Sequence, residues 1–139
     1  MAQLATYLTF DGTCAEAIGF YERVLNGKIG FMMKIADSPM ASQMPPEAQQ
    51  RIMHARLDLG DQVLMASDSM GHEPYQGMHG FTMSLSYDTV AQGKPFFDAL
   101  AEGGKITMPL QETFWADGFG MLTDRFGTPW MVNCGMRQP

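Results

Sequence analysis

The alternation of apolar and polar residues predicts short β-strands, with a helical pattern after the first of them. Residues 4–10 (LATYLTF) place Leu4, Thr6, Leu8 and Phe10 on one face, as a strand does. Residues 13–16 (TCAE) match a capping box, and apolar residues then follow helical spacing as far as the stop signal Asn26-Gly27. Further strands are expected at 28–35, 52–59 and 63–66, the last two joined by a tight turn at Gly60-Asp61.

Two segments lack any period and are expected to be loops. Residues 36–50 (ADSPMASQMPPEAQQ) hold three prolines, and residues 68–80 are punctuated by glycine and proline. The length of the first loop fits either a mobile flap or an insertion without a role.

The first half of the pattern recurs in the second half. Leu8-Thr9-Phe10-Asp11 returns 77 residues later as Leu85-Ser86-Tyr87-Asp88. Phe20-Tyr21 returns as Phe96-Phe97, and Gly27-Lys28-Ile29 returns as Gly104-Lys105-Ile106. Residues 89–92 repeat the capping box, while Pro95 predicts a kink or a later start of the second helix. Three such matches in order indicate a duplication. We therefore expect one α+β domain over 1–139, with a module at about 1–70 and another at about 79–139, whose sheets pair around a cleft with the helices outside.

Composition excludes several classes of function. Hydrophobic residues make up 45% of the chain and charged residues 17%, as in a soluble globular protein. The net charge of −6, without a basic stripe, argues against nucleic acid as a partner. No apolar run is long enough for a membrane span and no signal peptide is recognised, so a cytoplasmic location is expected.

Cys14 and Cys134 are expected to be free thiols. The fourteen methionines fit an adaptable core or a plastic pocket wall.

Three segments resemble a known superfamily: TYLTFDGTCAEAIGFYERVLNG, HARLDLGDQVLMASD and QETFWADGFGMLTDRFGTPWMVN. They are similar to the vicinal oxygen chelate superfamily of glyoxalase, bleomycin-resistance proteins and extradiol dioxygenases, and most of all to its PhnB-like branch. The resemblance covers essentially the whole chain. It implies two βαβββ modules that pair into a curved half-barrel sheet, a homodimer, and a cavity for a small organic ligand.

The resemblance also implies a divalent metal held by His, Gln or Glu on the first and fourth strands of each module. Here those strands offer residues 5–7 (ATY), 64–65 (LM), 81–83 (FTM) and 130–132 (WMV). None of these suits a hard or borderline cation. We therefore expect no cofactor and assign no metal ligand. A weaker alternative is a loop site formed by His72, His79 and Glu73.

Two residues are candidates for catalysis. His54 lies on the third strand. Histidine is the residue type best suited to act as an acid or a base at neutral pH, although a structural histidine is the simpler interpretation. Glu112 and Asp117 flank Trp115; a carboxylate that an indole desolvates can act as a general acid, whereas a turn carboxylate is normally solvated.

The aromatic stretch 111–133 either packs as a core hairpin or forms a pocket wall. Phe114 and Phe126 are expected in the core. The expected ligand-binding residues are Tyr7, His54, Asp68, Gln111, Trp115, Phe119 and Trp130.

We expect a small-molecule binding protein without a metal. One alternative is a metal-dependent lyase or isomerase resembling glyoxalase, in which His54 with Glu112 or Asp68 supplies the acid, the base or a rearranged metal site. Another is a structural dimer with a filled cavity.

Overall fold

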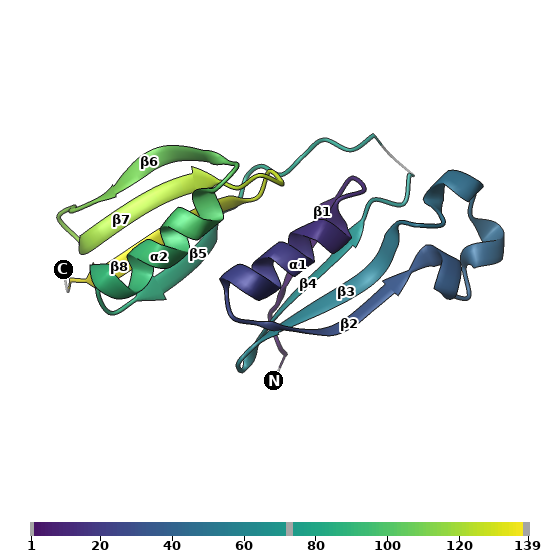
Figure 1. The fold of residues 1–139 in the computed structure, drawn as a ribbon, viewed down its shortest axis with the longest axis horizontal. Coiled ribbons are helices and arrows are strands. Elements are labelled where there is room, and N and C mark those ends of the chain that lie inside the picture. The colour runs from purple at the N-terminus through teal and green to yellow at the C-terminus, as the bar shows by residue number, and fades with distance from the viewer. Residues whose placement is uncertain (1, 72–73, 138–139) are drawn as a thin grey trace. The chain divides into compact units, whose positions relative to one another are not determined.

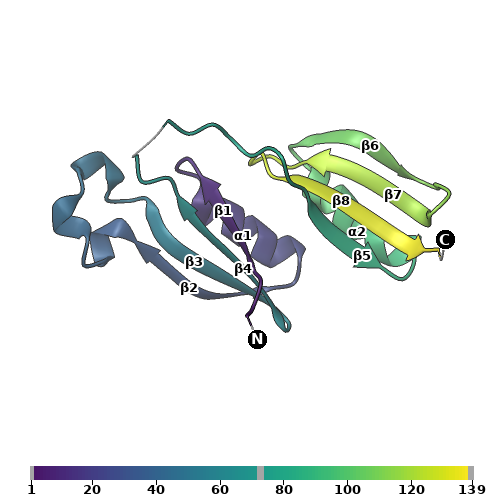
Figure 2. The same cartoon turned by 180° about the vertical axis from the view of Figure 1, so that it is seen from behind.

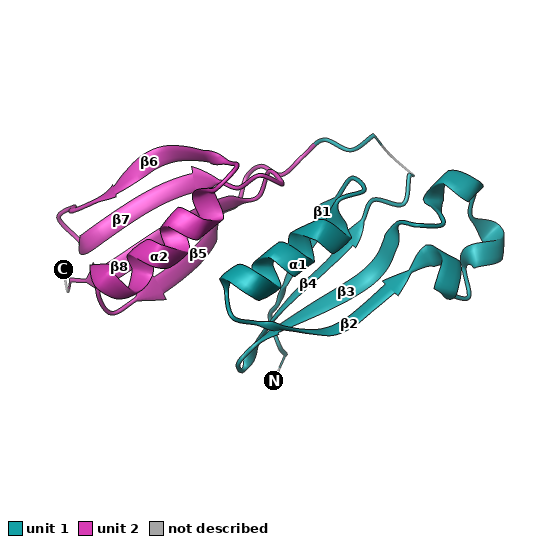
Figure 3. Cartoon of the chain, in the orientation of Figure 1, with its two compact units in different colours: residues 1–76 teal, residues 77–139 magenta. Residues whose placement is uncertain are grey.

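The computed structural model describes residues 2–71 and 74–137. The chain divides into two compact units, residues 1–76 and 77–139, so the division lies inside the linker expected between the modules (Figure 3). Each unit contains a strand, a helix and three further strands (Figure 1). Within the described residues, no helix is long and apolar enough to cross a membrane.

Unit 1 is a four-stranded sheet with one helix on one face. The strand order is β1-β4-β3-β2, with β1 parallel to β4 and the other neighbours antiparallel. Figure 2 shows the sheet from the side that carries no helix; we call this side the open face. The elements of unit 1 are β1 (Thr6–Phe10), α1 (Cys14–Val24), β2 (Lys28–Lys34), β3 (Ile52–Leu59) and β4 (Gln62–Asp68).

Unit 2 repeats this arrangement. Its strand order is β5-β8-β7-β6, with β5 parallel to β8. The helix approaches the sheet closely, because a Cβ on Gly120 would lie 2.7 Å from the ring of Phe97. The elements of unit 2 are β5 (Met83–Tyr87), α2 (Val90–Ala101), β6 (Lys105–Gln111), β7 (Ala116–Thr123) and β8 (Pro129–Met136).

Each core lies between the helix and its own sheet, where burying a large apolar side chain contributes about 1.5–3 kcal/mol. Unit 1 buries Leu8, Phe10, Cys14, Ala17, Ile18, Tyr21, Ala55, Leu57, Leu64 and Ala66. Unit 2 buries Phe97, Leu100, Ala116, Leu122, Trp130, Val132 and Cys134. Phe114, expected in a core, is 88% exposed, so that prediction was wrong.

The two helices begin differently. At α2 the Thr89 side chain accepts a hydrogen bond from the backbone N–H of Gln92, as the capping box predicts, and the helix runs on through Pro95 without a delayed start. At α1 the predicted cap is not formed: within the described residues, the Thr13 side chain makes no capping hydrogen bond. Instead the carboxylate of Asp68, at the end of β4, accepts from the backbone N–H groups of Gly12 and Cys14.

The segment 36–50 is not structureless. Two short 3-10 helices lie inside it, at Ala41–Gln43 and Pro46–Ala48, and a third, Ile35–Asp37, begins one residue before it. The Gln49 side chain donates to the backbone carbonyls of Ala41 and Met44 and so ties the segment to itself.

The α+β class and the two βαβββ modules are thereby confirmed. The pairing of the two sheets into one half-barrel stays a prediction.

Candidate functional site

Strand register shows which side chains share the open face of unit 1, because directly paired residues point to the same side of a sheet. One row crosses all four strands: Tyr7 pairs with Met65, Met65 with Arg56, and Arg56 with Phe31. The neighbours of Tyr7 in β1, including Leu8, point to the helix side and are buried there.

Three rings gather on this face. The Tyr7 hydroxyl lies 3.0 Å from His54 Nδ1, and the two rings stack with centroids 5.6 Å apart. The Phe31 ring lies 5.8 Å from the His54 ring. Tyr7 is 46% and Phe31 40% exposed, whereas His54 is half-buried. We call these three residues the Tyr7–His54–Phe31 cluster.

The tautomer of His54 sets what the cluster can do chemically. When Tyr7 donates to Nδ1, Nε2 carries the proton and can donate to a ligand; when Nδ1 carries the proton, Tyr7 accepts and Nε2 becomes a base. The cluster thus combines flat apolar surface with one nitrogen that is suited to hydrogen bonding or proton transfer.

Sequence reasoning found Tyr7 and His54 but missed Phe31. Ile29 pairs with Leu57 on the helix side, and strict alternation would place Phe31 on that side too. A register shift between Ile29 and Phe31 turns Phe31 to the open face instead. Gly30, inside this irregularity, leaves room for a neighbouring ion pair: a Cβ there would lie 2.5 Å from both Arg56 and Asp58.

The open face of unit 2 holds three of the other predicted residues. Phe119 pairs with Gln111 on β6 and with Asn133 on β8, so the three share a face. The Trp115 ring lies edge-on to Phe119 at 5.2 Å. Unit 2 thus brings Gln111, Trp115 and Phe119 together.

Trp130 and Asp68 belong to the opposite, helix-covered faces. Trp130 pairs with Leu122, is 2% exposed, and donates from Nε1 to Asp124 at 2.8 Å. Asp68 is also 2% exposed, and its oxygens accept three backbone hydrogen bonds. Because these contacts account for both side chains, we leave them out of the ligand-contacting set.

Glu112 is not in the apolar setting expected for a general acid. Its side chain is 70% exposed and accepts a hydrogen bond from Arg137, which also donates to Asp117 at 2.9 Å. Hydrogen bonds to Glu112 and Asp117 raise the pKa of Arg137. The structure therefore favours the solvated alternative for Glu112.

The side chains at the expected metal positions do not fit a divalent metal. At the expected positions the open face offers the Tyr7 phenol and the Met65 thioether in unit 1 and the Met131 thioether in unit 2. The β5 residue that pairs with Met131 is Ser84, one position beyond the expected 81–83, and it offers a hydroxyl. Divalent cations of this superfamily's kind prefer carboxylate and imidazole. Across 2–71 and 74–137, no three His, Cys, Asp or Glu side chains form a group that could hold a metal. His72 and Glu73 lie outside the described residues, and His79 is exposed.

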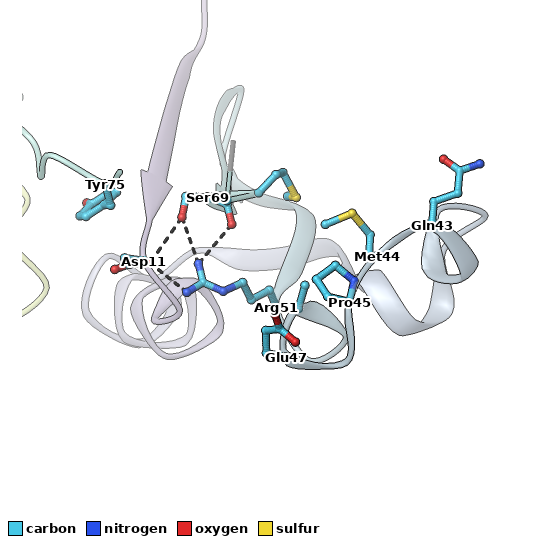
Figure 4. A pocket seen from close by; sticks show the side chains of 11 residues that line it. Asp11, Gln43, Met44, Pro45, Glu47, Arg51, Ser69 and Tyr75 are labelled. Carbon is cyan, nitrogen blue, oxygen red and sulfur yellow. Dashed lines mark hydrogen bonds and ion pairs between the residues drawn. The ribbon is translucent and has the colours of Figure 1, made fainter. Parts of the chain in front are cut away.

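A surface groove of about 550 Å³ in unit 1 was not predicted (Figure 4). Its floor is the Arg51 guanidinium, which pairs with Asp11 at 2.9 Å and donates to the hydroxyl and backbone carbonyl of Ser69. Tyr75 lines it and donates to a backbone carbonyl; burial, and then Asp11, raise the pKa of Tyr75. Its apolar wall comes from Met44, Pro45, Ala48 and Met70.

Known proteins resemble the chain over its full length. Protein YjdN of Escherichia coli (strain K12) is 39% identical, and the match covers 98% of this chain and 97% of YjdN. The crystal structure of protein PA1353 from Pseudomonas aeruginosa is 47% identical, with a TM-score of 0.89 and coverage of 96% of this chain and 98% of that one.

A structure from Bacillus cereus, described as a putative 3-demethylubiquinone-9 3-methyltransferase and PhnB protein, has a TM-score of 0.79 at 23% identity. It covers 96% of this chain and 99% of its own, and it shows a shared fold. The structural neighbours of the chain thus include a protein described as PhnB, the branch that the sequence resembles. The family model described as Glyoxalase/Bleomycin resistance protein/Dioxygenase superfamily matches residues 3–132. The chain therefore belongs to the glyoxalase/bleomycin resistance protein/dioxygenase superfamily.

Proposed function

We propose that this protein binds a small, planar organic ligand at the open face of unit 1 and needs no metal to do so. The observation that supports this is the Tyr7–His54–Phe31 cluster, in which two exposed rings flank a half-buried imidazole. An exposed group of aromatic side chains around one polar nitrogen is typical of a ligand-contacting surface.

The cluster suits a ligand with a flat apolar body and one hydrogen-bond acceptor. Stacking on Tyr7 or Phe31 contributes about 0.5–1.5 kcal/mol beyond the area buried. A hydrogen bond from His54 Nε2 contributes about 1 kcal/mol net and fixes the orientation of the ligand. Ligand capture of this kind is our proposal for the function, with the protein acting as a homodimer, as the superfamily resemblance implies.

The test is calorimetric titration with two planar probes, 2-naphthoate and an anthraquinone sulfonate. We expect saturable binding of at least one probe by metal-free protein. His54→Gln is expected to weaken binding by about five- to tenfold through the lost donor and altered stacking. Tyr7→Phe keeps the ring but removes the bond that sets the tautomer, so it should weaken binding less than His54→Gln does.

Phe114→Leu is the matched control, because Phe114 is the most exposed phenylalanine of unit 2 and has no part in the cluster. This variant should bind as the wild type does. The proposal fails if neither probe saturates, or if His54→Gln and Phe114→Leu bind equally well. Activity on a hemithioacetal that appears only with added divalent metal would support the glyoxalase-like alternative. Sedimentation velocity tests the homodimer.

A further inference from the structure

A row of three methionines crosses the open face of unit 2. Met108 on β6 pairs with Met121 on β7, and Met121 pairs with Met131 on β8. Paired residues share a face of the sheet, so Met121 has one thioether neighbour on each side. Met108 stands between two register shifts of β6, one after Ile106 and one before Gln111. We call these three residues the methionine row.

The row is accessible from outside unit 2. Met108 is 38% exposed, and Met121 and Met131 are half-buried. α2 covers the other face of this sheet, where Gly120 approaches Phe97. Since each methionine has three rotatable bonds, neighbouring sulfur atoms can turn towards a common point.

The chemistry of the row differs from that of the inherited metal site. Thioether sulfur is a soft, neutral ligand that selects monovalent copper and rejects the hard divalent cations that prefer oxygen. Ser84 on β5, which pairs with Met131 and lies beside the row, offers a hydroxyl, which is a poor ligand for such a cation.

The two thiols of the chain do not share this face. Cys134 pairs with Gly118 and Tyr87, on the side that α2 covers, and Cys14 lies in the core of unit 1. Burial raises the pKa of both thiols, to about 12 for Cys14, which disfavours the thiolate that would otherwise compete for a soft cation.

We propose that the methionine row binds one soft monovalent cation, Cu(I) in the cell and Ag(I) as its redox-inert analogue, through the thioethers of Met108, Met121 and Met131. The cation arrives and leaves as a monovalent ion, so no electron is transferred. The inference rests on unit 2 alone and does not depend on the ligand proposed for unit 1.

The pH dependence of binding identifies the ligand type. Thiolate and imidazole sites must lose protons to bind a metal, so their affinity rises with pH. Thioethers carry no exchangeable proton. We therefore expect the affinity for Ag(I) to be unchanged between pH 5.5 and 8.

The experiment is anaerobic Cu(I) titration against a chromogenic chelator, with Ag(I) titration followed by the methyl NMR signals of ¹³C-methyl methionine. We expect one equivalent of Cu(I) to bind, and Ag(I) to shift the methyl signals of Met108, Met121 and Met131. Met121→Leu removes the central ligand at similar volume and should weaken binding by at least about tenfold.

Met40→Leu is the matched control, because Met40 is 41% exposed and lies in unit 1; it should bind as the wild type does. A Cys14→Ala/Cys134→Ala variant should keep the site. Circular dichroism of every variant shows whether it is folded, and the methyl shifts of wild-type protein test the row even if Met121→Leu does not fold. The proposal is wrong if no cation binds, if the shifted methyl signals belong to other methionines, or if binding disappears with the cysteines.

Discussion

Replacing Asp68 by Asn should destabilise unit 1 more than the same replacement at an exposed aspartate does. Asp68 Oδ1 accepts from the backbone N–H of Gly12 at 2.8 Å and of Cys14 at 3.0 Å, and Oδ2 accepts from Ile52 at 2.8 Å. An asparagine has one acceptor oxygen. If that oxygen keeps Gly12 and Cys14, the amide NH₂ faces the N–H of Ile52, donor against donor.

The magnitude follows from these contacts. A hydrogen bond to a charged group contributes about 1.5–3 kcal/mol, and leaving the N–H of Ile52 unpaired costs about 1–3 kcal/mol more. Removing a buried charge returns part of this through lower desolvation. We expect Asp68→Asn to lower the free energy of unfolding by about 3 kcal/mol. Asp11→Asn is the control, because its ion pair with Arg51 is partly exposed and such pairs contribute about 0–1 kcal/mol.

Urea unfolding followed by circular dichroism measures the free energy, and amide hydrogen exchange locates the loss. Protection of the Gly12, Cys14 and Ile52 amides should fall in Asp68→Asn. A loss no greater than that of Asp11→Asn, or unchanged protection of these amides, would refute the reasoning.

Two further predictions concern close packing and a buried thiol. Gly104→Ala should destabilise unit 2 by about 1–3 kcal/mol in urea unfolding, because the new Cβ would lie 2.3 Å from the Thr123 carbonyl oxygen. Gly19→Ala lies in a helix with open space around the new Cβ and should stabilise unit 1 by about 0.5–1 kcal/mol. If the two substitutions change the free energy of unfolding in the same direction, this account is wrong. Burial, and then Asp68, raise the pKa of Cys14 from 9.0 to about 12, so its contribution to stability is present below pH 9 and is lost as the pH rises towards 12. Urea midpoints between pH 8 and 11 should therefore fall less steeply in Cys14→Ala than in the wild type; equal slopes would contradict the assignment.

The helices and strands were predictable because their periods are local, whereas one helix cap was not. The sequence around Thr89 contains its own cap, and the structure forms it. The sequence around Thr13 has the same pattern, but the N–H of Cys14, the first residue of α1, donates to Asp68, which lies 54 residues further along the chain. A local motif cannot predict a hydrogen bond to a carboxylate on a strand that is distant in the sequence.

The candidate site was partly predictable for a related reason. Alternation states which residues of one strand share a side, but it does not state which side faces the helix. Phe119 and Trp130 lie on neighbouring strands, and only their register shows that they point to opposite faces. Phe31 required one more fact, the register shift in β2, which non-local pairing with β3 determines.

The length of the segment between β2 and β3 has almost no effect on the free energy of pairing β1 with β4. Thr6 pairs with Leu64 across 58 positions, whereas Met83 pairs with Trp130 across 47. Loop-closure entropy grows only with the logarithm of length, so the longer loop costs unit 1 about 0.2 kcal/mol more than unit 2. Residues 36–50 can therefore change in length or composition, and the groove wall of Met44, Pro45 and Ala48 with them, while the parallel closure of the sheet is kept.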